Sequence, residues 1–128
     1  MMMLMILLGA ATASPVADGN DGLAMAQRLT AAIRGEAAFR DSDFATPLEA
    51  GDKAALRRFG SCKVAEISYT LLPDPTERDT YVQNPNDVLV RLGCKGVPTT
   101  TPVGLSVHLK DGKIGTIETH NADLMRAQ

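Results

Sequence analysis

The chain has 128 residues, a length that suits one modest hydrophobic core. Its 13 lysines and arginines nearly balance 15 aspartates and glutamates, so the net charge of −2 creates no strong field to attract nucleic acid or an anionic membrane. The 45% hydrophobic content argues against wholesale disorder, and the absence of tryptophan argues against a stacking platform for sugars or bases.

Residues 1–13 have the pattern of an export signal. An unbroken apolar run, MMMLMILL, leads to small residues that end in Ala11-Thr12-Ala13, the A-x-A pattern cleaved by signal peptidase. We therefore expect a signal peptide at 1–13, a flexible linker at 14–20, a single α+β domain at 21–128, and a periplasmic or secreted location. Because no Lys or Arg precedes the run, an N-terminal core element is the alternative. The run is far shorter than the roughly 20 residues that cross a bilayer, so no membrane span is expected after processing.

The two cysteines, Cys62 and Cys94, are expected to pair with each other. They lack the Cys-x-x-Cys spacing of a redox motif or a structural zinc site. In an oxidising compartment their disulfide would stabilise the fold by roughly 3–4 kcal/mol. If the chain stays in the cytosol, both are instead small buried thiols.

Two helices are predicted in the first half of the domain. The longer one begins near Asp21, where either Asn20 or Asp21 can cap the first amides, and it ends before Gly35. Its expected apolar stripe consists of Leu23, Ala26, Leu29 and Ile33. Residues 46–49, TPLE, predict a capping box with proline at the first helical position. Asp52 then caps a short helix over 53–59.

Strand patterns follow. Residues 63–72 alternate, with an apolar face formed by Ala65, Ile67, Tyr69 and Leu71. Residues 73–86, PDPTERDTYVQNPN, predict a long polar loop that is either functional or loosely ordered. A second strand over 87–94 has one face formed by Val88, Val90, Leu92 and Cys94.

The last two strands form the clearest element of the sequence. Alternating apolar residues over 103–109 run into Asp111-Gly112, which predicts a two-residue type I′ hairpin. An unbulged register would turn Glu118 and His120 toward the core. A bulge at Gly115 would instead bury both Ile114 and Ile117, and we favour it because burying an unpaired carboxylate is costly.

Few side chains are candidates for chemistry. The sequence has no metalloprotease, nucleophile-elbow, phosphate-loop or dinucleotide motif, and we expect no catalytic residue, cofactor or metal site. Three residues are candidates for lining a pocket: Tyr69, Glu118 and His120. The phenol of Tyr69 points either into an interior cavity or to a carbonyl at the sheet edge. His108 is expected to face solvent, and Asp41 and Asp43 to form a solvated acidic turn.

The order of elements predicts an α+β fold, with one long and one short N-terminal helix packed on a curved antiparallel sheet of about four strands. Two segments resemble the NTF2-like superfamily, a cone-shaped, cystatin-like α+β group. Residues 48–56, LEAGDKAAL, are similar to the aGDxxaL helix start of many bacterial members, and residues 111–117, DGKIGTI, to their dGKIxxI hairpin. Enzymes of this superfamily use an Asp, Tyr or His at the mouth of the cone, but the resemblance matches no catalytic position here. The chain also lacks one helix and a strand pair of the full cone.

The sequence therefore predicts a small exported domain that binds a small molecule or a protein without catalysis, with a homodimer as a candidate assembly. A lyase or isomerase of the NTF2-like kind and a cystatin-like protein inhibitor are the alternatives. An enzyme needs an apolar cavity with converging polar groups, one of them with a displaced pKa. An inhibitor needs a rigid protruding loop with an apolar anchor, for which Tyr81 and Val82 are the candidates. An interaction module needs an exposed apolar patch.

Overall fold

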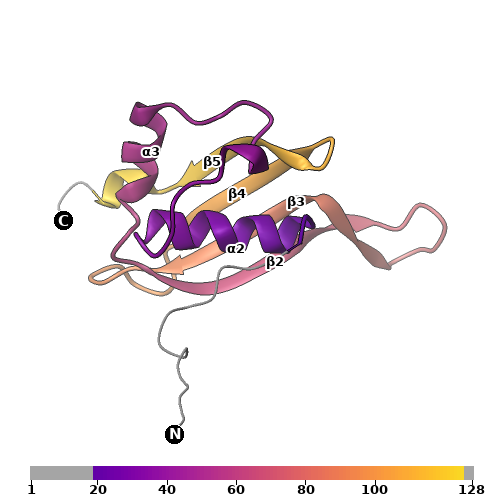
Figure 1. Cartoon of the computed structure of the whole chain (residues 1–128). Helices are drawn as coiled ribbons and strands as arrows, with labels where there is room; N and C mark the ends of the chain where they lie inside the picture. Colours follow the sequence, from indigo (N-terminus) through magenta and orange to yellow (C-terminus); the bar gives the residue numbers. More distant parts are fainter. Residues whose placement is uncertain (1–18, 126–128) are drawn as a thin grey trace, which may run out of the picture.

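The computed structural model describes residues 19–125, so the expected signal peptide (1–13) and most of the expected linker lie outside the described residues. Two helices pack on an antiparallel sheet with the strand order β2-β3-β4-β5 (Figure 1). In chain order the elements are α2 (Gly22–Ile33), the 3-10 helix η1 (Asp41–Asp43), α3 (Ala50–Arg57), β2 (Lys63–Pro73), β3 (Tyr81–Gly93), β4 (Val103–Lys110), β5 (Lys113–His120) and the 3-10 helix η2 (Ala122–Met125). The expected α+β fold with four strands is confirmed.

Helix α2 begins and ends where the sequence predicts. The Asp21 carboxylate accepts a 2.8 Å hydrogen bond from the Ala24 amide, and Gly35 takes a positive φ of 79° after the helix ends. The sheet covers one side of α2, while residues of the following connector, including Phe39 and Phe44, pack on another. The buried face of α2 is therefore wider than the predicted apolar stripe, because it also includes Ala24, Met25, Ala31 and Ala32.

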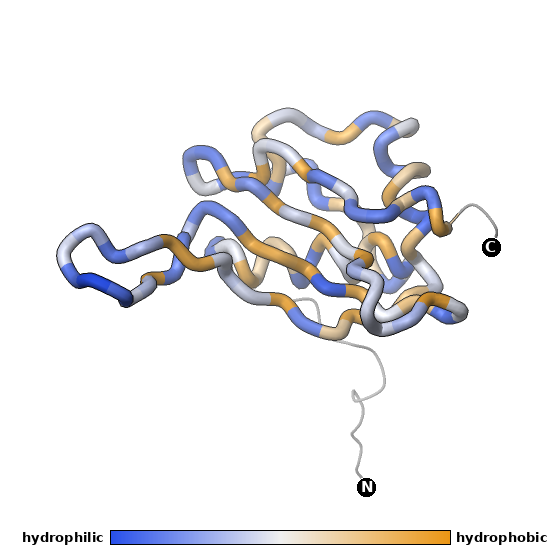
Figure 2. The backbone as a smooth tube through the Cα atoms, turned by 180° about the vertical axis from the view of Figure 1, so that it is seen from behind, coloured by the Kyte–Doolittle hydropathy of each residue, from blue (hydrophilic) through white to orange (hydrophobic). Residues whose placement is uncertain are grey.

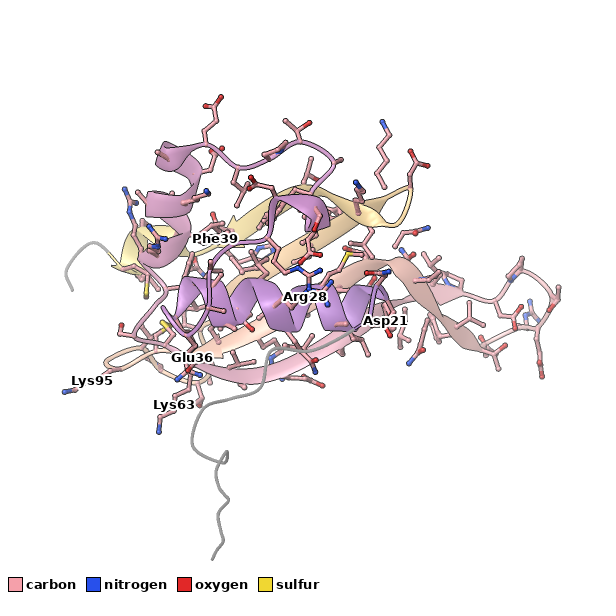
Figure 3. All side chains as sticks on the ribbon, viewed as in Figure 1. Asp21, Arg28, Glu36, Phe39, Lys63 and Lys95 are labelled. Atoms are coloured by element: carbon pink, nitrogen blue, oxygen red, sulfur yellow. A yellow bond between two sulfur atoms is a disulfide. The ribbon has the colours of Figure 1, made fainter. Side chains whose placement is uncertain are left out.

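The connector after α2 contains a buried ion pair that sequence analysis missed. Asp43 was expected in a solvated turn, but η1 turns its side chain inward against Arg28 of α2 (Figure 3 labels Arg28). Asp43 is only 5% exposed, whereas Asp41 remains on the surface. A guanidinium at this depth requires a carboxylate partner, because an unpaired buried charge is strongly unfavourable.

Helix α3 begins after the predicted turn at 46–49 but before the predicted helix over 53–59. Residues 46–49 are not helical, and the helix starts at Ala50 with Glu49 as its N-cap. The Asp52 carboxylate, three residues on, accepts a 3.2 Å hydrogen bond from the Glu49 amide. Asp52 therefore completes a capping box from inside the first turn, and the predicted cap at Thr46 and the predicted helix start at Asp52 were both wrong.

A bulge in β2 changes which residues face the core. Val64 pairs with Leu92 and Glu66 with Arg91, so Ala65 has no partner across the ladder. The extra residue turns Val64 inward and leaves Ala65 exposed. The predicted inward orientation was wrong for Ala65 and for Leu71, which is 60% exposed. The predicted apolar face of 87–94 is buried or partly buried as expected.

The last hairpin has the predicted turn and the predicted bulge. Asp111 and Gly112 both take positive φ values, 54° and 77°, as a type I′ turn requires. His108 pairs with Thr116 and Leu109 with Ile114, which leaves Gly115 as the extra residue. The bulge buries Ile114 and lets Ile117 pack against the core, while Glu118 turns outward.

Half of the segment predicted as a long loop is strand. Strand β2 continues to Pro73 and β3 starts at Tyr81, so the connection shrinks to residues 74–80. Strand β4 pairs with β3 only from Asp87 onward. The β2–β3 hairpin consequently projects past the N-terminal end of α2 and past the β4–β5 turn (Figure 1). We call residues 71–83 the β2–β3 arm.

Candidate functional site

The outer face of the sheet, opposite α2, carries a row of polar side chains centred on His108. Its Nδ1 lies 2.9 Å from Oδ1 of Asp87 on β3, and its Nε2 lies 3.0 Å from Oε1 of Glu118 on β5. Thr70 on β2 extends the row by donating a 2.9 Å hydrogen bond to Asp87. The hydrogen bond from His108, followed by its charge, lowers the pKa of the Glu118 carboxyl below its usual value. Sequence analysis placed His108 on this face but gave no sign of its partners, which come from two other strands.

The three residues predicted to line a pocket are not brought together. Tyr69 lies on the inner face, with its ring close to Gly22 at the start of α2. Glu118 and His120 lie on the outer face, where His120 Nε2 is 2.7 Å from the hydroxyl of Ser106. The sheet therefore separates Tyr69 from the other two.

The β2–β3 arm carries most of the exposed large hydrophobic side chains of residues 19–125. Of the five large hydrophobic side chains exposed there, four belong to the arm: Leu71 (60%), Leu72 (45%), Tyr81 (64%) and Val82 (43%). Leu72 pairs with Val82, so these two share one face of the hairpin. Leu71 pairs with Gln83 and Pro73 with Tyr81, which places Leu71 and Tyr81 on the opposite face. Both faces of the arm are thus apolar, and residues 19–125 leave both of them exposed.

The tip of the arm is acidic and internally hydrogen-bonded. The Asp74 amide donates to the Thr80 carbonyl (2.9 Å), and the Asp74 carboxylate accepts from the amide (2.8 Å) and hydroxyl (2.7 Å) of Thr76. The hydrogen bond from the Thr76 amide, followed by the bond from the Thr76 hydroxyl, lowers the pKa of the Asp74 carboxyl below its usual value. Glu77, Arg78 and Asp79 complete the tip, which is hydrophilic in Figure 2. The turn therefore has a defined conformation, which the sequence pattern of 73–86 left open.

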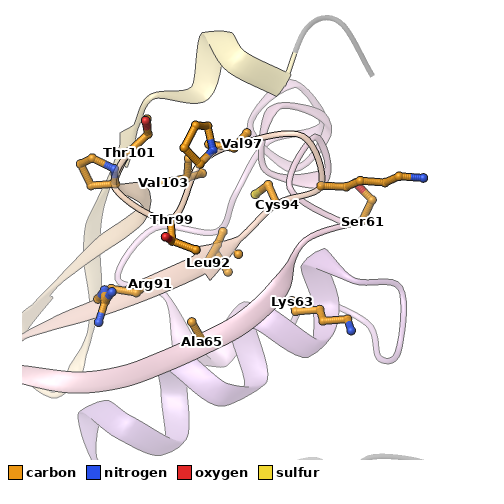
Figure 4. A pocket seen from close by; sticks show the side chains of 14 residues that line it. Ser61, Lys63, Ala65, Arg91, Leu92, Cys94, Val97, Thr99, Thr101 and Val103 are labelled. Carbon is orange, nitrogen blue, oxygen red and sulfur yellow. The ribbon is translucent and has the colours of Figure 1, made fainter.

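A cavity of about 550 Å³ lies at the end of the sheet away from the arm (Figure 4). The ends of β2 and β3 form one wall, and the connection over residues 94–102 forms the other. Three cationic side chains line it: Lys63, Arg91 and Lys95. The cavity was not predicted, because its walls come together only when β2 and β3 pair and the Cys62–Cys94 disulfide joins their ends.

The two cysteines form the predicted disulfide, with Cα atoms 4.4 Å apart. The described residues contain no cluster of three or more His, Cys, Asp or Glu side chains placed to hold a metal ion. Within the same range, every helix is too short or too polar to cross a membrane. Comparisons with protein-family models, curated proteins and solved structures find no match to this chain.

Proposed function

We propose that this chain is an exported, non-catalytic interaction module that inserts its β2–β3 arm into an apolar groove of a partner protein. The observation that carries the proposal is the concentration of exposed hydrophobic side chains on both faces of one projecting hairpin. A surface that docks flat needs one apolar face. Two opposite apolar faces suit an element that is enclosed on both sides, as a wedge is in a groove.

The charge of the tip favours a protein groove over a lipid surface. Asp74, Glu77 and Asp79 outnumber the single Arg78, so the end of the arm would be repelled by an anionic membrane. The same charges favour a groove that opens to solvent or to basic side chains at its far end. The hydrogen bonds of the tip support the proposal further, since a preorganised arm loses less conformational entropy on binding.

The disulfide supports the exported location. A pair of cysteines joined in this way is typical of the periplasm or the extracellular space, where thiols are oxidised. The signal-peptide pattern of residues 1–13 favours the same compartment.

The alternatives from sequence analysis receive different support. A cystatin-like inhibitor is the case in which the partner groove is the active-site cleft of an enzyme, and the arm with Tyr81 and Val82 suits it. A lyase or isomerase of the NTF2-like kind would need Tyr69 to converge with Glu118 or His120, and these lie on opposite faces of the sheet. The groups with lowered pKa, Asp74 and Glu118, lie at the arm tip and on the outer face, outside the lining of the large cavity.

Site-specific photo-crosslinking tests the proposal. A benzophenone amino acid is placed at Leu72 or Val82 on the arm, with Thr116 on the exposed edge of β5 as the matched control, and the chain is irradiated in the envelope or medium of a producing host. We expect a covalent adduct with one other protein from both arm positions and none from Thr116. Equal yields from the arm and from Thr116 would contradict the proposal. An adduct of two copies of this chain would replace the partner with a homodimer.

The captured partner then allows a quantitative test. We expect Leu72→Ser and Val82→Ser, on one face, and Tyr81→Ser, on the other, each to weaken binding of the purified partner by about tenfold or more. Loss of affinity from substitutions on one face only would show a flat docking surface and would contradict insertion. Inhibition of the partner by the intact chain would identify it as the target of an inhibitor.

A further inference from the structure

The cavity at the far end of the sheet has a floor shaped by the β2 bulge. The bulge turns Ala65 to the outer face, between Lys63 and Arg91 (Figure 4). A one-carbon side chain at this exposed position leaves open the space that a larger residue would fill. The roof above it consists of Val97, Thr99 and neighbouring residues of the 94–102 connection.

The roof is held in place at both ends. At its start, Cys94 is tied to Cys62, and the Val97 amide donates a 3.1 Å hydrogen bond to the Cys94 carbonyl. At its end, the side-chain amide of Asn121 donates to the carbonyl of Pro102. Pro102 and a second proline in the connection fix two backbone φ angles. The cavity is therefore largely preformed, as small-molecule sites usually are.

The charge of the cavity is positive in a chain whose net charge is −2. Lys63, Arg91 and Lys95 line it, and no aspartate or glutamate does. Arg91 forms a 2.9 Å ion pair with Glu66, which lies outside the lining, while neither lysine forms an ion pair with a described residue. Figure 3 shows Lys63 and Lys95 at the same end of the molecule.

The rest of the lining is apolar or hydroxylic. Leu92, Val97 and Val103 supply aliphatic surface, and Thr99 and Thr101 supply hydroxyl groups. A volume of about 550 Å³ lies in the usual range for small-molecule sites. Cationic side chains beside aliphatic surface match a ligand that has one anionic group and an apolar body. An inorganic anion would leave the aliphatic surface of the cavity uncovered. A neutral apolar molecule would make no ion pair with the lysines.

We propose that this cavity binds a small organic carboxylate, whose charged group contacts Lys63 and Lys95 and whose apolar body lies between Ala65 and Val97. The site is independent of the arm, which lies at the opposite end of the sheet, and it is therefore a second binding function of the same domain.

Amide-resolved NMR titration of the oxidised chain tests this site with benzoate and 4-phenylbutyrate as probes. We expect saturable shifts confined to amides around the cavity, such as those of Gly93, Val97 and Thr99. Benzamide, which has the shape of benzoate without its charge, should bind about tenfold more weakly. Inorganic phosphate, which lacks the apolar body, should also bind more weakly.

Two variants make the test specific. Ala65→Leu fills the floor of the cavity from an exposed position, and we expect it to abolish the shifts. The double variant Lys63→Gln/Lys95→Gln should weaken benzoate binding by about tenfold. Its control is Lys110→Gln/Lys113→Gln, which removes the same charge from exposed positions beside the β4–β5 turn and should leave the affinity unchanged.

Three outcomes would overturn the proposal. Equal binding of benzoate and benzamide would show that the lysines take no part. Equal weakening by the two lysine double variants would show nonspecific charge attraction. Unchanged binding by Ala65→Leu, with a spectrum that shows the variant folded, would place the ligand elsewhere.

Discussion

The guanidinium of Arg28 and the carboxylate of Asp43 form a two-point contact inside the protein. Arg28 Nε donates to Asp43 Oδ2 at 2.8 Å and Nη2 donates to Oδ1 at 2.9 Å, while Nη1 donates to the carbonyl of Gly19 at 2.6 Å. The two side chains are 2% and 7% exposed. The pair fixes the connector after α2 against the middle of the helix, with the planar geometry that favours arginine over lysine.

Removing the carboxylate should destabilise the fold strongly. Asp43→Ala takes the carboxylate away from the buried Arg28 guanidinium, whose hydrogen bond to the Gly19 carbonyl does not neutralise its charge, and we expect the free energy of unfolding to fall by about 3–5 kcal/mol. Urea unfolding followed by circular dichroism measures the change. The matched control is Asp41→Ala, an exposed carboxylate of the same turn, which should cost less than about 0.5 kcal/mol. A similar loss in both variants would contradict a specific role for the buried pair.

Gly104 should tolerate no side chain. A Cβ at this position in β4 would overlap the carbonyl oxygen of Val90 on the neighbouring strand, and backbone cannot move aside as a flexible side chain can. We expect Gly104→Ala to lower the free energy of unfolding by about 1–3 kcal/mol. Gly93→Ala is the control, since a Cβ on that strand glycine would meet no atom within 4 Å. Equal melting temperatures of the two variants would refute the close approach of β3 and β4 at Gly104.

The disulfide should stabilise the fold and the cavity together. Cys62 and Cys94 join segments 32 residues apart, and Cys62→Ser/Cys94→Ser should lower the free energy of unfolding by roughly 3–4 kcal/mol. Because Cys94 is also where the roof of the cavity begins, the same variant should bind benzoate more weakly than the oxidised chain at a temperature where both are folded. Retention of full stability after reduction would contradict the first expectation.

The carboxyl of Glu118 should titrate below its usual value in the native protein. Its folded-state pKa is lowered by the hydrogen bond from His108, so its contribution to stability is present above the unfolded-state pKa and is lost as the pH falls through the lower folded-state value. Carbon-detected NMR of the carboxyl gives the midpoint directly. We expect His108→Asn to raise the midpoint and His120→Asn to raise it less, because the charge of His120 is the smallest of the causes. A larger effect of His120→Asn would reverse the assignment.

Local patterns in the sequence determined the elements that depend on few neighbours. Asp21 marks the start of α2 and Gly35 follows its end. The sequence shows both, because an N-cap hydrogen bond and a glycine with positive φ involve only residues within one turn of the helix. Asp111-Gly112 set the last turn for the same reason. The alternation of apolar and polar residues predicted the bulge at Gly115. Only a bulged register buries both Ile114 and Ile117 and turns Glu118 outward.

Tertiary structure decided what depends on partners far along the chain. The buried state of Asp43 follows from Arg28, which lies 15 residues earlier and gives no local sign of needing a carboxylate. The outward turn of Ala65 follows from pairing with β3. Nothing in the polar sequence of 73–86 indicated that strands would extend beyond the sheet and expose Leu72 and Val82 together.

The candidate sites divide in the same way. The residues of the cavity and of the His108 row form no sequence motif, and they become sites only where strands bring them together. Composition and pattern therefore determined the α+β class, the cysteine pair and the turns, all of which follow from short-range chemistry. Cross-strand register and the path of the connections decided the arm, the cavity and the polar row, because these depend on contacts between residues that the sequence keeps apart.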